Sequence, residues 1–182
     1  MLTDEDDHRL MERVAEGDAA AFRTLVARHT SSLTAHATRM LRNASEAEEV
    51  VQEAYVRLWK QAPSYRPDAK LKTFLYGIAH HLCIDRLRAR KRHDADAVDD
   101  LVSTDRPSGG IQERELRSRV QAEVAGLPER QRAALSLVHF EELSNIEAAR
   151  LLEVSVEALE SLLSRARRTL KERLANVVEQ GG

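Results

Sequence analysis

The chain has 182 residues, of which 42% are hydrophobic and 32% are charged, and its formal net charge is -2. This apolar content is enough for packed cores, while a 4% share of aromatic residues and the near absence of alternating β-branched runs favour an all-α fold. A single cysteine excludes an internal disulfide bond, and no apolar run approaches the roughly 20 residues that a membrane span needs. Because the N-terminal segment MLTDEDDHRL is acidic and lacks an apolar stretch, we expect no signal peptide and a cytoplasmic protein.

The first part of the chain predicts three amphipathic helices in succession. A short helix over residues 9–15 ends before Gly17, and Asp18 can cap the second helix through its carboxylate. The third helix is expected to begin with a capping box, in which Ser45 and Glu48 bond each other's backbone N–H groups. The side chains of the second and third helices that are predicted to face a core are Phe22, Leu25, Val26, Leu33, Met40, Ala47, Val50, Val51, Ala54 and Leu58.

The outer face of the third helix is unusual for a solvated surface, because it places the only tryptophan and a valine among acidic and polar side chains. Its members are Glu49, Gln52, Glu53, Val56, Trp59 and Lys60. Exposed aromatic anchors are typical of protein-docking surfaces. The alternative is that Trp59 folds back under the loop at Pro63 and belongs to the core.

A fourth helix is predicted from Thr73 to about Arg92, after a loop bracketed by Pro63 and Pro67, and basic residues dominate residues 65–92. The side chains predicted to face inward are Leu75, Ile78, Leu82 and Ala89. Lysines and arginines beside aromatic rings are the combination that binds single-stranded nucleic acid, since cations neutralise phosphates and rings stack on unpaired bases. The residues of this kind are Tyr65, Lys70, Lys72, Phe74, Tyr76, Arg86 and Arg88. The alternative for Phe74 and Tyr76 is core packing.

Neither a metal site nor a catalytic site is predicted. His81 and Asp85 are four residues apart on the fourth helix, near His80 and Cys83, but no further ligand cluster has a recognisable spacing. The chain has no Gly-rich phosphate loop, no nucleophile elbow and no paired catalytic carboxylates. We therefore expect a protein that is not an enzyme and needs no cofactor.

An acidic linker is predicted at residues 93–112, where aspartates precede the sequence Pro-Ser-Gly-Gly. It divides the chain into an N-terminal helical domain over residues 1–92 and a C-terminal domain over residues 113–182.

The C-terminal domain carries the pattern of a helix-turn-helix over residues 127–170. Leu127-Pro128 opens one helix, Ser144 or Asn145 can cap a second that carries Ile146, and Ser155 can cap a third after a tight connection. The third helix is predicted to bury a stripe of Leu159, Leu163, Ala166 and Leu170. Its opposite face carries Ser161, Ser164, Arg165 and Arg168, as a helix that enters a DNA major groove requires. The alternative is a three-helix bundle with a solvated basic face.

The segments SEAEEVVQEAYVRLW, KLKTFLYGIAHHLCIDRLRARKR and LPERQRAALSLVHFEELSNIEAARLLEVSVEALESLLSRARRTL, with the acidic linker between the last two, resemble the extracytoplasmic-function sigma factors of bacterial RNA polymerase. The resemblance covers residues 15–173 and implies two helical domains. It also implies binding to core RNA polymerase and promoter DNA, and inhibition by an anti-sigma factor.

The resemblance implies a role for each surface. Glu49, Gln52, Glu53 and Trp59 match the helix that binds the polymerase clamp. Lys70, Lys72, Phe74, His81 and Arg88 lie in the part that reads and opens the downstream (minus-ten) element, in which the loop over residues 67–72 captures a flipped base. Ser161, Ser164, Arg165, Arg167, Arg168 and Lys171 lie on the helix that meets the upstream (minus-thirty-five) element.

The chain departs from the family pattern at a few positions. Many members have Trp at the position of Phe74 and Asn at the position of His81, and basic residues are common where Glu160 and Leu162 stand. Leu162 can extend the buried stripe, and Glu160 can repel phosphate or accept a hydrogen bond from a cytosine amino group. We therefore expect upstream affinity to come mainly from the basic side chains of this helix.

Two other classes of function compete with this interpretation. A dimeric helix-turn-helix regulator would bind double-stranded operators without polymerase, and it leaves the outer face of the third helix without a role. A helical adaptor that binds only proteins predicts no salt-dependent affinity for DNA.

Overall fold

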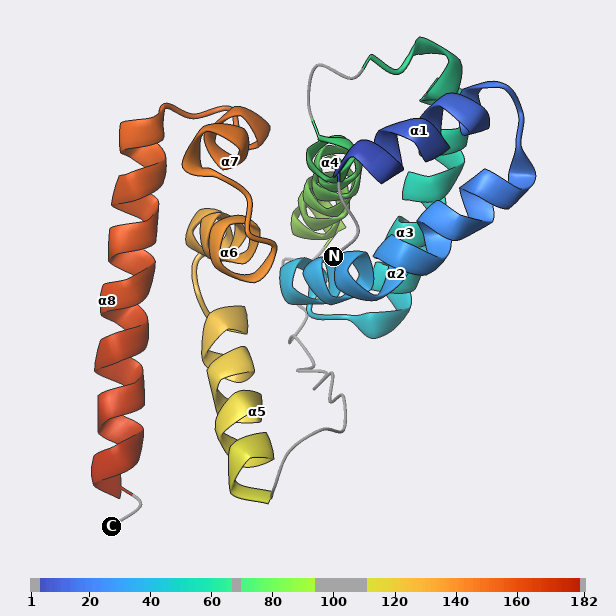
Figure 1. The fold of residues 1–182 in the computed structure, drawn as a ribbon. Coiled ribbons are helices and arrows are strands. Elements are labelled where there is room, and N and C mark those ends of the chain that lie inside the picture. Colours follow the sequence, from blue (N-terminus) through green and yellow to red (C-terminus); the bar gives the residue numbers. More distant parts are fainter. Residues whose placement is uncertain (1–3, 67–69, 94–110, 181–182) are drawn as a thin grey trace. The chain divides into compact units, whose positions relative to one another are not determined.

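The computed structural model describes residues 4–66, 70–93 and 111–180, and these residues form helices and turns without any strand (Figure 1). The all-α prediction is confirmed for this part of the chain. The chain divides into two compact units, one made of residues 1–37 and 44–98 and the other of residues 38–43 and 99–182. Residues 94–110, which hold most of the predicted linker, lie outside the described residues.

The first unit contains α1 (Asp4–Ala15), α2 (Ala19–Leu41) up to residue 37, α3 (Ala44–Gln61) and α4 (Leu71–His93), and a 3-10 turn, η1 (Ala62–Ser64), follows α3. Thus α1 begins five residues before the predicted start at Arg9. Within this unit α3 packs against α4, and α1 contacts both η1 and α4. The α1 helix is therefore a neighbour of the segment that joins α3 to α4.

The connection from α1 to α2 follows the sequence prediction. Gly17 adopts a φ of 88°, which L-residues with a side chain rarely adopt, and this lets the chain turn after α1. The Asp18 carboxylate then accepts hydrogen bonds from the N–H groups of Ala20 (2.8 Å) and Ala21 (3.1 Å), as an N-cap does. The Ala21 N–H, together with Arg13, holds the pKa of Asp18 below its usual value.

The predicted start of α3 at Ser45 is wrong, because the helix begins one residue earlier. The helix begins at Ala44, so Ser45 lies inside its first turn and cannot form the predicted capping box with Glu48. The predicted apolar stripe of α3 is confirmed, because its members Ala47, Val50, Val51, Ala54 and Leu58 are all buried.

The second unit contains α5 (Ile111–Ala125), α6 (Glu129–Leu135), a π-helical turn η2 (Ser136–Phe140), α7 (Asn145–Leu151) and the long α8 (Val156–Gln180). The sequence interpretation did not identify α5, which packs against α8 in this unit (Figure 1). Pro128 is the N-cap of α6, and its carbonyl accepts a hydrogen bond from the N–H of Arg132 at 2.9 Å.

The helix-turn-helix consists of α7, a short turn and α8. Ser144 caps α7 in a full capping box with Glu147, and Ser155 accepts a hydrogen bond from the N–H of Ala158 at the start of α8. Between the helices Glu153 adopts a left-handed φ of 54°, which reverses the chain. Leu159, Leu163 and Ala166 are buried as predicted, whereas Ile146 is 64% exposed and does not face the core.

Candidate functional site

The predicted docking surface forms one continuous face of α3. Glu49, Gln52, Val56 and Trp59 recur at spacings of three and four residues, which places them on one side of a helix, and all four are exposed. Val56 is 46% exposed although its side chain is apolar. The opposite side of the helix is the buried stripe that packs against the rest of the unit.

Trp59 lies at the end of this face and is 37% exposed. Its ring meets the ring of Phe22 on α2 edge to face, with centroids 5.0 Å apart and planes at 71°. Phe22 also makes an edge-to-face contact with Tyr55. Trp59 is thus braced from one side by Phe22 while part of its surface stays open to solvent.

Two of the acidic residues on the docking surface have partners within the chain. The Glu49 carboxylate pairs with the Arg86 guanidinium of α4 at 2.8 Å, and Glu53 pairs with Arg57 one turn away at 2.9 Å. Because the four side chains are 39–58% exposed, water screens both pairs, which contribute little to stability and can exchange partners. Gln52, Val56 and Trp59 are therefore the part of this surface that a partner can bind without breaking an ion pair described here.

Three of the residues predicted to bind the downstream element share one side of α4. Phe74, His81 and Arg88 recur every seven residues and so lie on one side of the helix, where His81 and Arg88 are exposed and Phe74 is half-buried. The Nδ1 atom of His81 lies 2.7 Å from the carbonyl oxygen of Gly77, four residues earlier. This contact keeps the ring close to the helix surface.

Lys72 and Tyr76 occupy a different side of α4. Lys72 is two residues from Phe74, about 200° around the helix, and its ammonium lies 5.7 Å from the centre of the Tyr76 ring. Tyr76 is fully buried, so its interpretation as a base-stacking ring is wrong and the core alternative holds. Lys70 is exposed just before α4, while residues 67–69 of the predicted base-capture loop lie outside the described residues.

Tyr65 and Phe74 contact each other on the same side of the first unit. Their ring centroids are 5.4 Å apart with planes at 59°, and both side chains are half-buried. The Tyr65 hydroxyl also lies 3.0 Å from Nδ1 of His8 on α1. The sequence interpretation did not identify His8, because nothing in the spacing links it to a residue 57 positions later.

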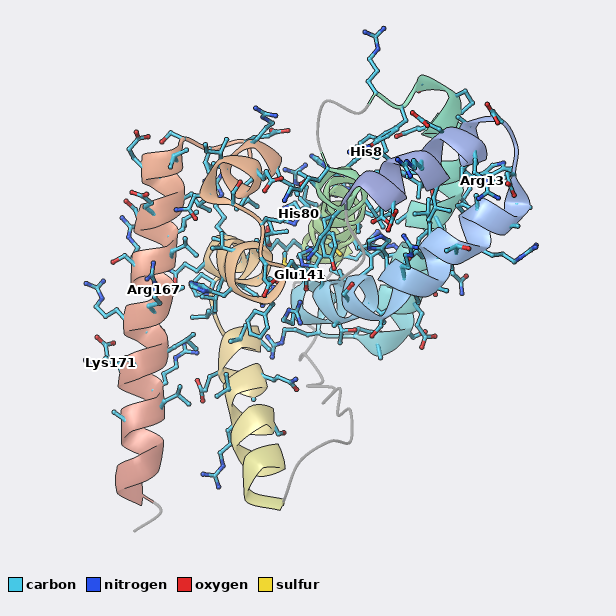
Figure 2. All side chains as sticks on the ribbon, in the orientation of Figure 1. His8, Arg13, His80, Glu141, Arg167 and Lys171 are labelled. Carbon is cyan, nitrogen blue, oxygen red and sulfur yellow. The ribbon has the colours of Figure 1, made fainter. Side chains whose placement is uncertain are left out.

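The α8 helix presents an exposed polar stripe opposite its buried leucines. Ser161, Ser164, Arg165, Arg168 and Lys171 are all exposed and fall within one side of the helix. Arg167 is also exposed, but it stands at the edge of this stripe, where its Nε donates to the Leu163 carbonyl at 3.3 Å. Arg167 and Lys171 lie one turn apart on α8 (Figure 2).

Two acidic residues lie near the start of α8. A hydrogen bond with its own backbone N–H, and another with the Ser155 side chain, lower the pKa of Glu157, which keeps its carboxylate ionised at the helix N-terminus. Glu160 is exposed one turn later, and Leu162 is half-buried at the margin of the core stripe. The basic part of the stripe therefore starts at Arg165.

Among the described residues, no group of three or more His, Cys, Asp or Glu side chains is arranged to hold a metal ion. None of the helices in the same part of the chain is long and apolar enough to cross a membrane.

Comparison with protein families gives two matches that follow the two units. Residues 25–93 match the family described as Sigma-70 region 2, and residues 117–170 match Sigma-70, region 4. The first match contains α3 and α4, and the second contains α6, α7 and the exposed polar stripe of α8 up to Leu170.

Curated relatives align over almost the full chain. The RNA polymerase sigma-H factor of Pseudomonas aeruginosa is 30% identical over 99% of this chain and 100% of its own length. The ECF RNA polymerase sigma factor SigW of Bacillus subtilis is 28% identical, with 92% of this chain and 96% of the relative covered. The ECF RNA polymerase sigma-E factor of Escherichia coli strain K12 is also 28% identical, with 96% and 97% covered.

Two solved structures share the fold of this chain. CnrH, in complex with the cytosolic domain of CnrY, superposes with a TM-score of 0.71 at 26% identity, covering 94% of this chain and 98% of CnrH. RpoE of Bartonella quintana, in complex with the anti-sigma factor NepR, has a TM-score of 0.72 at 24% identity, covering 85% and 96%.

Proposed function

The chain belongs to the extracytoplasmic-function sigma factors of bacterial RNA polymerase, and we propose that it directs core polymerase to a defined set of promoters and helps to open them. The observation that carries this proposal is the match of both units, in order, to the two sigma-70 regions. The chemistry of RNA synthesis then belongs to the polymerase, and this chain supplies binding surfaces.

The exposed face of α3 is the proposed polymerase-binding surface. Val56 and Trp59 offer apolar area that gains free energy when a partner covers it, and the contact with Phe22 limits how far the Trp59 ring can move. A ring that is already held in place loses less conformational entropy on binding. Gln52 adds a side chain that can both donate and accept hydrogen bonds at the centre of this face.

The side of α4 that carries Phe74, His81 and Arg88 is the proposed binding surface for the downstream element. Arg88 and the exposed Lys70 can neutralise phosphates, while the half-buried Tyr65 and Phe74 rings are aromatic groups on which an unstacked base can stack. Because such a surface prefers single strands, it favours the opened duplex. Lys72 stands apart from it, and we assign Lys72 to phosphate contact alone.

The polar stripe of α8 is the proposed binding surface for the upstream element. A helix preceded by a tight turn, with small polar side chains at its N-terminal part and arginines after them, suits insertion into a major groove. Ser161 and Ser164 allow close approach to bases, and Arg165, Arg168 and Lys171 supply contacts to guanine or phosphate. Arg167 is assigned a phosphate contact at the edge of the stripe.

A protein inhibitor of the anti-sigma type is the proposed regulatory partner. CnrH was solved with a bound chain, the cytosolic domain of CnrY, and RpoE of Bartonella quintana with the anti-sigma factor NepR. The exposed Val56 and Trp59 are a surface that such an inhibitor can cover, and covering it would block the polymerase.

The test of this function is transcription in vitro. Core polymerase and the purified chain are mixed with a randomised duplex library, and the fragments that the complex retains are sequenced and used as templates. We expect a common pair of elements and run-off transcripts that need this chain. Retention of the same fragments by the chain alone, with no transcript, would instead support a regulator that acts without polymerase.

A further inference from the structure

Three aromatic rings from three elements form a row in the first unit, here called the ring row: His8 on α1, Tyr65 after η1, and Phe74 on α4. The His8 and Tyr65 rings are nearly parallel, with centroids 5.9 Å apart and planes at 29°, and the Tyr65 and Phe74 rings follow at 5.4 Å. Each of the three side chains is half-buried. Each ring of the row therefore keeps part of its surface exposed to solvent.

His8 is joined to Tyr65 by a hydrogen bond as well as by the ring contact. The Tyr65 hydroxyl and Nδ1 of His8 are 3.0 Å apart, so the hydroxyl can donate to the neutral imidazole. Tyr65 follows η1 in extended backbone, with φ of -62° and ψ of 130°, and no helix of its own holds its ring. His8 therefore fixes a side chain that the local backbone leaves adjustable.

The position of His8 is in turn fixed by its neighbour in sequence. Asp7 is buried, and its two carboxylate oxygens lie 2.8 Å from Arg28 Nη1 and 2.8 Å from His29 Nε2, both on α2. The apolar residues Met11 and Val14 of α1 are buried in the core of the unit. Because Asp7 anchors α1 to α2, the neighbouring His8 on α1 (Figure 2) is held where it can contact Tyr65.

The α1 helix lies outside the segment that matches Sigma-70 region 2, which begins at residue 25. We infer that His8 is a positioning residue for promoter opening: it holds the Tyr65 ring, and through it the Phe74 ring, in the orientation that stacks on an unpaired base of the opened strand. This inference rests on the proposed function, since it assigns the ring row to single-stranded DNA. It adds the N-terminal helix to the elements that determine opening.

The experiment uses core polymerase reconstituted with the full chain and two DNA probes. One probe is a selected duplex promoter, on which the rate of opening is followed by a fluorescent base in the downstream element. The other is a single-stranded oligonucleotide of the non-template downstream element, whose affinity is measured. The variants are His8→Ala, His8→Asn, Tyr65→Phe and the double variant, and Glu12→Ala is the control because Glu12 is exposed on α1 one turn away.

We expect His8→Ala to lower affinity for the single strand about tenfold, which corresponds to about 1.4 kcal/mol of lost stacking. The rate of duplex opening should fall by a similar factor, while binding to core polymerase and the thermal midpoint stay close to wild type. Asn can place its amide oxygen near the position of Nδ1, so His8→Asn should recover part of the affinity. Tyr65→Phe and His8→Ala should be non-additive, because each removes the same hydrogen bond.

Opening by His8→Ala at the wild-type rate, with wild-type affinity for the single strand, would overturn the inference while leaving the proposed function intact. A loss that His8→Asn does not relieve and that adds fully to Tyr65→Phe would also overturn it. If the wild-type complex itself fails to open any selected promoter, the proposed function fails, and that outcome is separate from any effect at His8.

Discussion

The basic stripe of α8 allows a quantitative prediction about salt dependence. Arg165, Arg168 and Lys171 are exposed on one side of the helix, and changing all three to Ala removes up to three phosphate contacts while leaving the buried Leu159 and Leu163 in place. Each phosphate contact contributes about 0.9 to the slope of log affinity against log salt. If all three side chains contact phosphates, the slope of the triple variant should be smaller in magnitude than that of wild type by about 2.7.

This change in slope is large enough to measure directly. With a slope change of about 2.7, raising the salt from about 50 to 200 mM should weaken DNA binding by wild type about 40-fold more than DNA binding by the triple variant. The assay titrates the reconstituted polymerase complex onto a duplex that carries the selected upstream element, at four salt concentrations. Arg119→Ala with Arg130→Ala is the control, because these exposed arginines lie on α5 and α6 rather than on α8.

An unchanged slope in the triple variant would refute the assignment of these side chains to phosphates. The control removes two positive charges and the triple variant three, so an equal reduction of the slope per charge removed would show that the effect comes from net charge and not from the stripe. Loss of affinity without any change in slope would indicate that the three side chains contact bases only.

Three further predictions concern stability and the affinity for DNA. Leu163→Ala should lower the free energy of unfolding by about 2–5 kcal/mol, measured by urea denaturation, because Leu163 lies on the buried side of α8 and the change leaves a cavity in the core. Folding lowers the pKa of Asp18, so the ionised carboxylate stabilises the folded state at pH values above the pKa of the unfolded chain, and this effect is lost as the pH falls through the lower pKa of the folded state. The thermal midpoint of Asp18→Asn should therefore fall less than that of wild type between about pH 5 and pH 3. Glu160→Gln should raise affinity for duplex DNA most at low salt, since it removes a negative charge beside the basic stripe, and an equal change at all salt concentrations would contradict this.

Much of the fold could be predicted because its signals are local. Gly17 and Asp18 specify a turn and a cap within a few residues, and Ser144 with Glu147 does the same for α7. The buried leucines of α8 recur at helical spacing, so the periodicity alone identifies the core face. The same kind of local signal failed at α3: the interpretation of Ser45 as a cap placed the start of the helix too late, because the helix begins at Ala44.

The contacts that shape the candidate surfaces could not be predicted, because they join distant parts of the sequence. Nothing in the spacing shows that Asp7 pairs with Arg28 and His29, or that Tyr65 meets His8. Tyr76 is two residues from Phe74 and looks equally suited to stack on a base, but the packing of the unit buries it.

The most direct test of the account is binding to core RNA polymerase. Wild type, the double variant Gln52→Ala/Trp59→Ala and the control Glu12→Ala/Glu16→Ala are each mixed with core polymerase and separated by gel filtration, after circular dichroism has established that all three are folded. The account predicts that wild type and control co-elute with polymerase and that the double variant does not. Failure of the folded wild type to co-elute, with affinity for duplex DNA retained, would contradict it.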